Sequence, residues 1–477
     1  MENYIVAVDL GSSETKVVTG VCDEKKPFGF DYLFSEAQNS KGIRRGAVYN
    51  REEASKVLAN LMIGVDKRLR AGQKKGTPLS KIVGVNINGN QFQTYTARET
   101  LRLQGQPVSK RTLQYIEQKA KDSQLQYSND EDIIRLVPLG YSIDNEPDTD
   151  DVIGRSGATF EAKYLCFRVR KKDLEAIGSA FQNAKDKPTC YLTTASAKAG
   201  VLLSPAMLRG GAVLVDLGAG VTGVAAFYRD ALRHEVSIPF GSDTITSDIK
   251  TAFGISQEDA EYLKRNAGII KDADVKKMYD VELPSGKTIP IDGSFYNFVV
   301  KARVEEIAAY VSAAIAEAQR RGCREIKVFL TGGGAKLKGL DEVFADKLGL
   351  NVYIAPSSVV GLPDIDLCEF AGALGMASQM ARLKASEEEN LQPTLQMGDP
   401  SAAESDTEEQ DEQPAPEEAA AEARNAQKPA AQTDAGEAHR SHEPSQEKET
   451  GAKNRSLFGK LKNTFDRMFE DETNIKS

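Results

Sequence analysis

The chain has 477 residues, which is more than one hydrophobic core usually organises, so its length predicts two or more domains. Its acidic residues outnumber its basic residues by 70 to 61, and the net charge of −9 argues against general nucleic-acid binding. The five cysteines are isolated, and the most apolar stretch, 211–227, contains Asp216 and several glycines. We therefore expect a protein of a reducing cytoplasm, without a structural metal and without a transmembrane segment.

The first chemical motif lies at 5–18. An apolar stretch of strand length ends at Asp9, and a second strand follows a short turn made of Gly11, Ser12 and Ser13. A turn with few Cβ atoms lets backbone N–H groups approach a polyphosphate, and a carboxylate at the strand end is suited to a hydrated Mg²⁺ ion. Alone the motif is weak evidence, because a small-residue turn after a strand is more often only a tight turn.

A small α+β module is predicted over 81–163, inserted between the first motif and the rest of its own domain. Residues 82–87 and 133–143 have strand patterns, and the second contains a proline that suits an edge strand. Residues 109–120 combine an N-cap serine with apolar positions at helical spacing. A further strand pattern at 164–170 marks the expected return to the first domain.

A second motif at 212–227 repeats the plan of the first. Its apolar strand ends at Asp216, and the residues that follow include Gly218, Ala219, Gly220 and Thr222. Two copies of one plan predict a duplicated domain whose loops face each other and clamp one nucleotide. A third segment, 326–340, is a strand and a glycine turn, where adenine and ribose can lie against bare backbone. Taken alone, a plain strand-to-helix turn explains it equally well.

The composition changes in the C-terminal part of the chain. Residues 385–452 are mostly Ala, Glu, Gln, Pro and Ser, which bury too little apolar surface to offset the entropy of ordering. We therefore expect a disordered tether, followed at 453–472 by an amphipathic helix whose apolar side chains fall within an arc of roughly 120°. The apolar set is Leu457, Phe458, Leu461, Phe465, Met468 and Phe469, and the basic residues at its borders include Lys460, Lys462 and Arg467.

This helix is interpreted as a membrane-targeting element, because its basic side chains can reach lipid phosphates while its aromatic residues enter the acyl boundary. The alternatives are docking on the protein's own core or in a partner's groove. The long linker argues against docking on the core, since a docked helix needs no such reach. One short helix binds a membrane weakly, so stable attachment requires the avidity of self-assembly.

In this order, the three glycine-containing segments resemble the phosphate and adenosine motifs of the actin, Hsp70 and sugar-kinase superfamily. Within it, the chain resembles the FtsA family of bacterial cell-division proteins. Two local segments carry the resemblance, a Gly-Ile-x-x-Gly segment at 42–46 and a Thr-x-Asp-Ile segment at 246–249 that is followed by a charged segment at 258–265. The early inserted module and the linker that ends in an amphipathic helix carry it further.

The resemblance implies an α/β, actin-like fold of two lobes, each with a ribonuclease-H-like core. Each lobe would be interrupted once, and the interruption of the second lobe would bind the C-terminal peptide of FtsZ. The expected parts are 1–80 and 164–205 for the first lobe, 81–163 for its inserted subdomain, 206–245 and 308–384 for the second lobe, 246–307 for its FtsZ-binding subdomain, 385–452 for the linker and 453–472 for the membrane helix.

The resemblance also implies roles for single residues. Asp9 and Asp216 would contact Mg²⁺ through water, and Asp216 would be the catalytic residue near the attacking water. The phosphates of ATP would lie between two sets of residues, Gly11, Ser12, Ser13 and Lys16 on one side and Gly218, Ala219, Gly220 and Thr222 on the other. The adenosine would contact Glu261, Lys264, Arg265, Gly332, Gly333 and Gly334. For Glu261 and Lys264 the alternative is an ordinary solvent-exposed helix pair.

The implied function is an ATP-binding scaffold that polymerises at the cytoplasmic side of the cell membrane. As a peripheral protein it would anchor FtsZ filaments at the division septum, together with other divisome proteins. The family's second loop has an acid where this chain has Gly223, and Ala219 adds a methyl group, so we expect at most a weak ATPase. The alternative is a phosphotransferase of the sugar-kinase type. It needs a catalytic base in a substrate cleft, and the sequence offers no candidate outside the nucleotide site.

Overall fold

The computed structural model describes residues 3–71, 79–126, 129–149, 151–271, 274–362 and 365–391, which all belong to one compact unit, Met1–Gln396. The predicted membrane helix and most of the predicted linker lie outside the described residues. No helix within these ranges combines the length and apolar character that crossing a bilayer requires.

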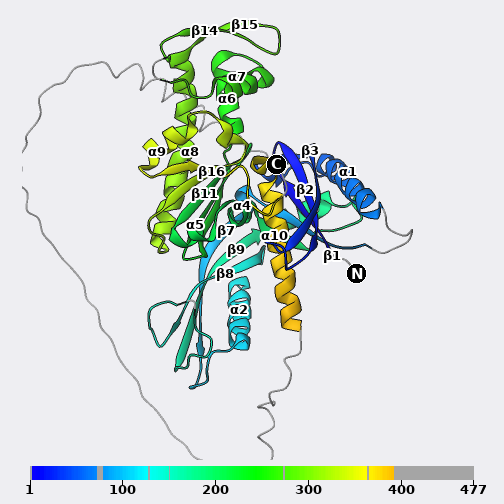
Figure 1. Ribbon diagram of the computed structural model, residues 1–477, viewed down its shortest axis with the longest axis vertical. Helices are drawn as coiled ribbons and strands as arrows, with labels where there is room; N and C mark the ends of the chain where they lie inside the picture. The colour runs from blue at the N-terminus through cyan, green and yellow to red at the C-terminus, as the bar shows by residue number, and fades with distance from the viewer. Residues whose placement is uncertain are drawn as a thin grey trace, which may run out of the picture. The chain divides into compact units, whose positions relative to one another are not determined.

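The first lobe is built on a mixed five-stranded sheet with the order β10-β6-β1-β2-β3 (Figure 1). The first three strands along the chain form an antiparallel meander, and the other two lie parallel to β1 and to each other. The strands are β1 (Asn3–Leu10), β2 (Glu14–Cys22), β3 (Phe30–Asn39), β6 (Ser80–Ile87) and β10 (Cys190–Thr193). A two-stranded ribbon, β4 (Ile43–Arg44) with β5 (Ala47–Val48), follows β3.

The second lobe repeats this sheet, with the order β13-β12-β11-β16-β17 and the same pattern of antiparallel and parallel pairs. Its strands are β11 (Ala212–Leu217), β12 (Thr222–Tyr228), β13 (Ala231–Ile238), β16 (Lys327–Thr331) and β17 (Val352–Ile354). Two sheets of one topology confirm the predicted actin-like fold with a duplicated core. The equivalent strands β1 and β11 each end at one of the two motif aspartates.

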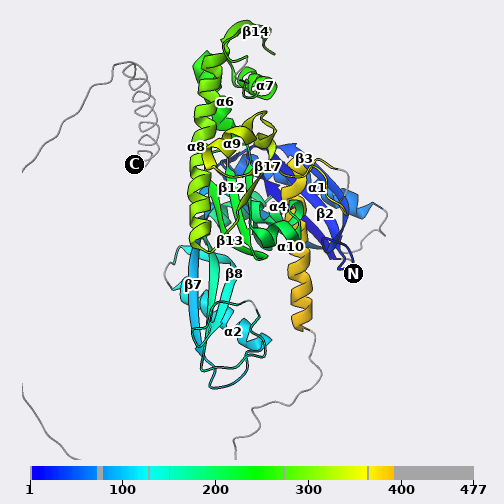
Figure 2. The same cartoon turned by 60° about the vertical axis from the view of Figure 1, so that its left-hand side comes forward.

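Two helices exchange between the lobes. The helix α4 (Thr194–Leu202) follows the first sheet but also packs on β11 and β12 of the second, while α10 (Leu367–Leu391) follows the second sheet and packs on β1, β2 and β6 of the first. Against each other they form the most extensive helix–helix contact among the described elements (Figure 2). This exchange brings the ends of β1 and β11 toward a common centre.

Other helices cover the outer faces of the two core sheets. On the first lobe, α1 (Arg51–Arg70) packs against α3 (Lys171–Ala180). On the second lobe, α8 packs on β12 and β13 and also against α9. The bounds of the second-lobe helices are α5 (Pro205–Gly210), α8 (Gly293–Arg320) and α9 (Leu340–Leu348), with a short 3-10 turn, η2 (Gly333–Lys336), before α9.

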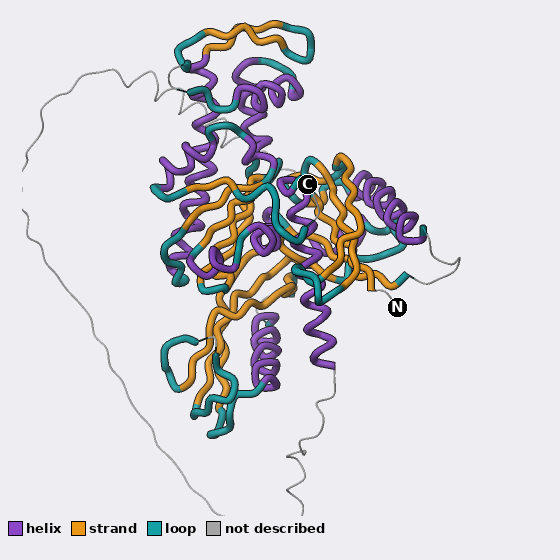
Figure 3. The backbone as a smooth tube through the Cα atoms, in the orientation of Figure 1, coloured by secondary structure: helices purple, strands orange, loops and turns teal. Residues whose placement is uncertain are grey.

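The inserted subdomain is a three-stranded antiparallel sheet, β7-β9-β8, with one helix beside it (Figure 3). Its elements are η1 (Gly89–Gln91), β7 (Phe92–Arg102), α2 (Lys110–Leu125), β8 (Glu131–Ile143) and β9 (Thr159–Arg170). Pro138 lies at a register shift of β8, which is an edge strand as its proline predicted.

The predicted bounds of this insert, 81–163, are wrong at both ends. Residues 82–87 belong to β6, which pairs with β1 in the centre of the first-lobe sheet, and 164–170 belong to β9 of the insert itself. The sequence pattern of β6 did not show which domain the strand belongs to. A central parallel strand is buried on both faces, so its residues do not alternate between apolar and polar as those of a half-exposed strand do.

The subdomain of the second lobe contains α6 (Ser242–Phe253), α7 (Gln257–Ala267) and the hairpin of β14 (Met278–Glu282) and β15 (Thr288–Asp292). The predicted boundary at 307 falls inside α8, a single helix that contacts both β15 and the core strands. The predicted start of the linker at 385 is also too early, because α10 continues to Leu391. Residues 387–389 are glutamates, which favour helix and extend one already anchored by its buried first turns.

His234 on β13 makes the fold sensitive to acid. The ring is 7% exposed, its Nδ1 has no hydrogen-bond partner among the described residues, and burial together with the nearby Arg321 lowers its pKa from 6.5 to about 4. Below pH 6.5 the imidazole of His234 is therefore protonated in the unfolded chain but stays neutral in the folded protein. The free energy of unfolding consequently falls as the pH drops from 6.5 toward 4.

We expect His234→Leu to weaken this pH dependence. From about 1.4 kcal/mol for each pKa unit, the wild type should lose on the order of 2–3 kcal/mol more than the variant between pH 7 and pH 4.5. Urea denaturation of both proteins across this range measures the difference, and groups common to both cancel. Parallel losses of stability in the two proteins would contradict the assignment to His234.

Candidate nucleotide site at the lobe junction

The two motif loops have the same local geometry. The N–H of Gly11 donates to the carbonyl of Asp9, and the N–H of Gly218 donates to the carbonyl of Asp216, each at 3.1 Å. The following strands also pair alike, since Lys16 is the register partner of Asp9 and Gly223 is the register partner of Asp216. The duplication therefore extends to the turn itself.

The two loops meet. A Cβ atom placed on Gly220 would lie 2.4 Å from the Oγ of Ser12 and 3.1 Å from the Cα of Arg45. The Oγ of Ser12 accepts a hydrogen bond from the N–H of Gly46 at 3.0 Å. The Gly-Ile-x-x-Gly segment thus lies beside both loops, and its two glycines and Arg45 have positive φ angles. Gly220 has no room for a side chain because the first loop occupies that space.

The first loop is braced from its own lobe. The hydroxyl of Ser40 donates to the carbonyl of Gly11 at 2.7 Å, and the N–H of Ser40 donates to the carbonyl of Ser13 at 2.8 Å. Lys16 forms an ion pair with Glu14 at 3.3 Å and is close enough to Asp9 to act on it electrostatically. Hydrogen bonds from Ser40 therefore hold the backbone of this turn at both Gly11 and Ser13.

Asp9 is buried at the end of β1. Its Oδ1 accepts a hydrogen bond from the amide of Asn86 at 2.7 Å, and the Oδ1 of Asn86 accepts one from the N–H of Leu10 at 2.6 Å. Burial raises the pKa of Asp9, and the nearby cations Lys198 and Lys16 partly offset that effect. A carboxylate in this position therefore depends on cations to remain ionised.

Asp216 is paired with a lysine that the sequence reasoning missed. The Nζ of Lys198, on α4, donates to the Oδ1 of Asp216 at 2.6 Å, and both side chains are buried. The sequence could have identified Lys198 as a site residue, because it is the one charged residue in the run of small and apolar residues at 190–208. A lysine inside an otherwise apolar helix indicates a buried partner.

These residues do not fit the predicted Mg²⁺ site. One oxygen of each carboxylate already binds a donor, Asn86 for Asp9 and Lys198 for Asp216. A Cβ on Gly372 of α10 would lie 2.4 Å from the second oxygen of Asp9, so α10 closes that side. Mg²⁺ keeps several waters in a near-octahedral shell, and the backbone at Gly372 and Gly332 occupies space next to these two carboxylates.

The second loop is held by the start of α6. The N–H groups of Ser242 and Asp243 donate to the carbonyls of Gly218 and Ala219, both at 2.9 Å. The hydroxyl of Thr222 donates to the carbonyl of Phe240 at 2.8 Å, so it serves the loop and not a ligand in this conformation. Gly241 is required here, because a Cβ on it would lie 2.3 Å from the carbonyl oxygen of Ala219.

The third glycine segment lies beside the second loop. Gly332 has φ +86°, and a Cβ on it would lie 2.5 Å from the Oδ1 of Asp216; one on Gly334 would lie 2.5 Å from the Cγ of Leu217. Packing against the end of β11 therefore accounts for both glycines. Gly333 has open space around it, so it is the member of this segment that offers bare backbone to a ligand.

The charged residues predicted to contact adenosine form a network centred on the buried Lys264. The Nζ of Lys264 donates to the hydroxyl of Thr246 at 2.8 Å and to the carbonyl of Ser242 at 3.2 Å, and it pairs with Glu261 at 2.7 Å. Arg265 is exposed and also pairs with Glu261 at 2.7 Å. Lys264 is buried, so the alternative of an ordinary solvent-exposed pair is wrong for it. The network ties α7 to α6 behind the second loop.

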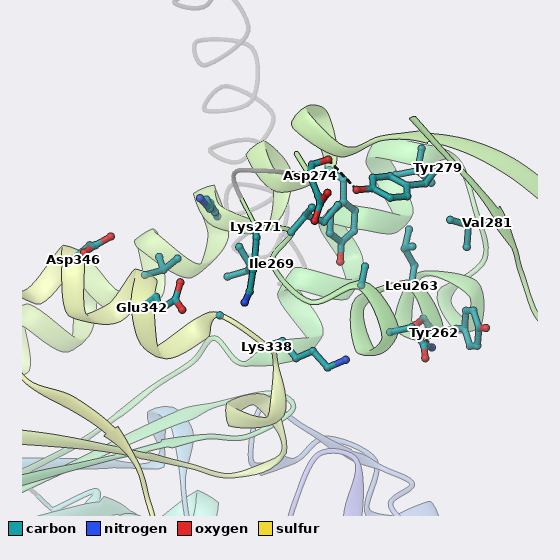
Figure 4. Close-up of a pocket in the computed structure, with 18 residues that line it drawn as sticks. Tyr262, Leu263, Ile269, Lys271, Asp274, Tyr279, Val281, Lys338, Glu342 and Asp346 are labelled. Atoms are coloured by element: carbon teal, nitrogen blue, oxygen red, sulfur yellow. Dashed lines mark hydrogen bonds between the residues drawn. The ribbon is translucent and has the colours of Figure 1, made fainter. Parts of the chain in front are cut away.

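A separate pocket of about 810 Å³ lies between the second-lobe subdomain and α9 of the second-lobe core, and none of the residues predicted to bind nucleotide lines it. Figure 4 shows Tyr262 and Leu263 of α7 on one side, Glu342 and Asp346 of α9 on another, and Tyr279 of β14 at the rim. The hydroxyl of Tyr279 donates to the carbonyl of Asp274 at 2.9 Å. Lys271, Lys301 and Lys338 add basic groups to the lining of the pocket, and Asp274, Glu342 and Asp346 add acidic ones. The predicted membrane residues, 457–469, lie outside the described residues.

The duplicated sheets, the helices exchanged between them and the two facing loops define the class of this protein, which is actin-like. A solved structure agrees on the fold: the PilM–PilN type IV pilus biogenesis complex matches with a TM-score of 0.53 and 14% identity, covering 80% of this chain and 98% of that chain.

Comparisons with known sequences show which actin-like proteins the chain is similar to. Residues 213–375 match the family model of the cell division protein FtsA. The cell division protein FtsA of Bacillus subtilis is 24% identical over 386 residues, covering 80% of this chain and 84% of the relative, and that of Escherichia coli is 23% identical over 372 residues, covering 76% and 86%. The chain is thus similar to FtsA proteins, in agreement with the resemblance carried by the sequence motifs.

Proposed function

We propose that this chain is a nucleotide-binding cell-division protein that assembles at the cytoplasmic side of the bacterial membrane and anchors FtsZ filaments at the division site. The observation that carries the proposal is a similarity to FtsA proteins over 76–80% of the chain, on a fold in which two equivalent phosphate-type loops meet at the lobe junction. The net charge of −9 argues against nucleic acid as a general partner.

ATP is the proposed ligand of the lobe junction, and its role is to bias conformation and self-assembly. Turnover is proposed to be slow, because the acid of the family's second loop is missing at Gly223 and Asp216 is engaged by Lys198. The same pairing argues against the alternative of a sugar-kinase-type phosphotransferase, since a carboxylate in an ion pair at 2.6 Å is a poor general base. The Mg²⁺ ion predicted from sequence is not part of the proposal.

The C-terminal peptide of FtsZ is proposed to bind the second-lobe subdomain. The pocket beside it supports this, because it is large enough for several side chains and combines aromatic residues with three lysines and three acidic residues. Two exposed aromatic residues near the start of α8, Phe295 and Phe298, extend the apolar surface of the same subdomain. Exposed aromatic residues on a small subdomain are typical of sites that bind protein segments.

Membrane attachment is assigned to the amphipathic segment at 453–472. Each large apolar side chain contributes about 1.5–3 kcal/mol when fully buried and less at an interface, so one helix is marginal and an assembled row of helices is stable. Co-sedimentation with anionic liposomes tests the proposal, using purified FtsZ, the full chain and a chain that ends at residue 453.

The full chain should sediment with the liposomes and bring FtsZ with it, whereas the truncated chain should leave both proteins in the supernatant. FtsZ that lacks its C-terminal peptide should remain in the supernatant even when the full chain sediments. Sedimentation of the truncated chain would contradict the membrane assignment, and equal recruitment of the shortened FtsZ would contradict the peptide assignment.

A further inference from the structure

Lys198 occupies an unusual position for a buried lysine. Every other side chain of α4 is small or apolar and uncharged, yet this one extends to the junction where the equivalent strands β1 and β11 end. It lies 2.6 Å from the Oδ1 of Asp216. On the other side, a Cβ on Gly372 would lie 2.4 Å from the Oδ2 of Asp9 and 3.2 Å from the Cε of Lys198, so the lysine and Asp9 are near neighbours as well.

The carboxylates at this junction already have cations beside them. Lys198 pairs with Asp216 and acts electrostatically on Asp9, and Lys16, which pairs with Glu14, also acts on Asp9. A divalent ion would have to displace the ammonium group of Lys198 or share the space with it at a repulsive distance. The crowding by Gly372 and Gly332 leaves little room for the shell of waters that Mg²⁺ retains.

Resting on the proposed nucleotide binding, we infer that Lys198 supplies the positive charge that a divalent ion would bring to this junction, so that the site takes a nucleoside triphosphate without Mg²⁺. The ammonium group is held by α4, pairs with Asp216 and lies near enough to Asp9 to act on it electrostatically, and it is present whether or not nucleotide is bound. Divalent metal therefore controls neither the closure of the two loops nor the affinity for the triphosphate.

The first test uses the wild-type protein and needs no variant. Calorimetric titration with ATP is performed in excess EDTA and in millimolar Mg²⁺ at matched ionic strength. The two dissociation constants should agree within about threefold. A tenfold or larger loss of affinity in EDTA, which corresponds to about 1.4 kcal/mol, would overturn the inference. Absence of ATP binding in both buffers would refute the proposed nucleotide function instead, and the second test would then decide on Lys198.

The second test uses the metal alone, without nucleotide. Mg²⁺ should leave the melting temperature of the wild type unchanged and should raise that of Lys198→Gln, because the variant leaves two buried carboxylates short of one positive charge. A rise for the wild type, or no rise for a folded Lys198→Gln, would overturn the inference. If Lys198→Gln does not fold, Lys198→Arg keeps the charge, and it should resemble the wild type in both tests; a new dependence on Mg²⁺ would overturn the inference.

Lys81 provides the matched control. Its side chain is also only 5% exposed and lies between two aspartates, Asp66 and Asp186, but it is on β6 outside the loop junction. Lys81→Gln should lower stability as any broken buried ion pair does, while ATP affinity stays the same in EDTA and in Mg²⁺. A change in the metal dependence of Lys81→Gln equal to that of Lys198→Gln would show a general effect of instability, and the inference would fail.

Discussion

Replacing Gly375 by alanine should destabilise the protein by about 1–3 kcal/mol, although alanine is the better helix former. Gly375 lies in α10 where that helix crosses α4, and a Cβ on it would lie 2.1 Å from the carbonyl oxygen of Ala197. The backbone of α4 cannot move away without separating the helices that join the two lobes. The methyl group would therefore open the most extensive helix contact of the described fold.

Gly200 is the matched control for this change. It lies in α4 itself, it is exposed, and a Cβ on it would meet no atom within 4 Å. Gly200→Ala should therefore gain the helix propensity of alanine, about 0.5–1 kcal/mol, without a steric cost. Urea denaturation followed by circular dichroism compares the two variants with the wild type. A Gly375→Ala protein as stable as Gly200→Ala would contradict the close crossing of α4 and α10.

Gly220→Asp should abolish most of the affinity for ATP. Its side chain would enter the space between the loops, where the Oγ of Ser12 lies 2.4 Å from the position of the Cβ. Its carboxylate would also add a negative charge beside the proposed phosphates in a partly desolvated site. A combined penalty of about 2–3 kcal/mol corresponds to roughly a 30- to 150-fold loss of affinity.

Gly210→Asp adds the same charge to the same lobe at the opposite end of β11, where a Cβ meets no atom within 4 Å. It should bind ATP as the wild type does. Isothermal titration calorimetry measures both variants, and circular dichroism checks that each is folded. Wild-type affinity in a folded Gly220→Asp protein would contradict the assignment of the nucleotide to the space where the two loops meet.

Much of the fold could be predicted from local pattern alone. The strand–turn–strand motifs at 5–18 and 212–227 are short-range features, because a strand end, a small-residue turn and a return strand lie within one hairpin. Their repetition was enough to predict a duplicated core, and both sheets have the topology that the duplication requires. The edge position of the proline-containing strand followed in the same way, since proline cannot donate to a ladder.

The boundaries between subdomains were less predictable because they depend on which strands pair. Residues 82–87 and 164–170 have clear strand patterns, but a hydrophobic pattern does not indicate which strand each segment pairs with. The first joins β1 in a parallel pair, and the second remains with the insert. The reason for the glycines at 332 and 334 could not be predicted from sequence either, since packing against β11 explains them as well as a ligand does.

The sequence by itself determined the strands, the two loops with their aspartates, the small inserted module and the resemblance to FtsA, because each of these is written in neighbouring residues. Only the tertiary structure decided what surrounds the aspartates. Lys198 precedes Asp216 by a helix and a turn, and Gly372 follows Asp9 by most of the chain, yet all four meet where α4 and α10 cross. Such a meeting depends on long-range packing between the lobes, which no local pattern encodes.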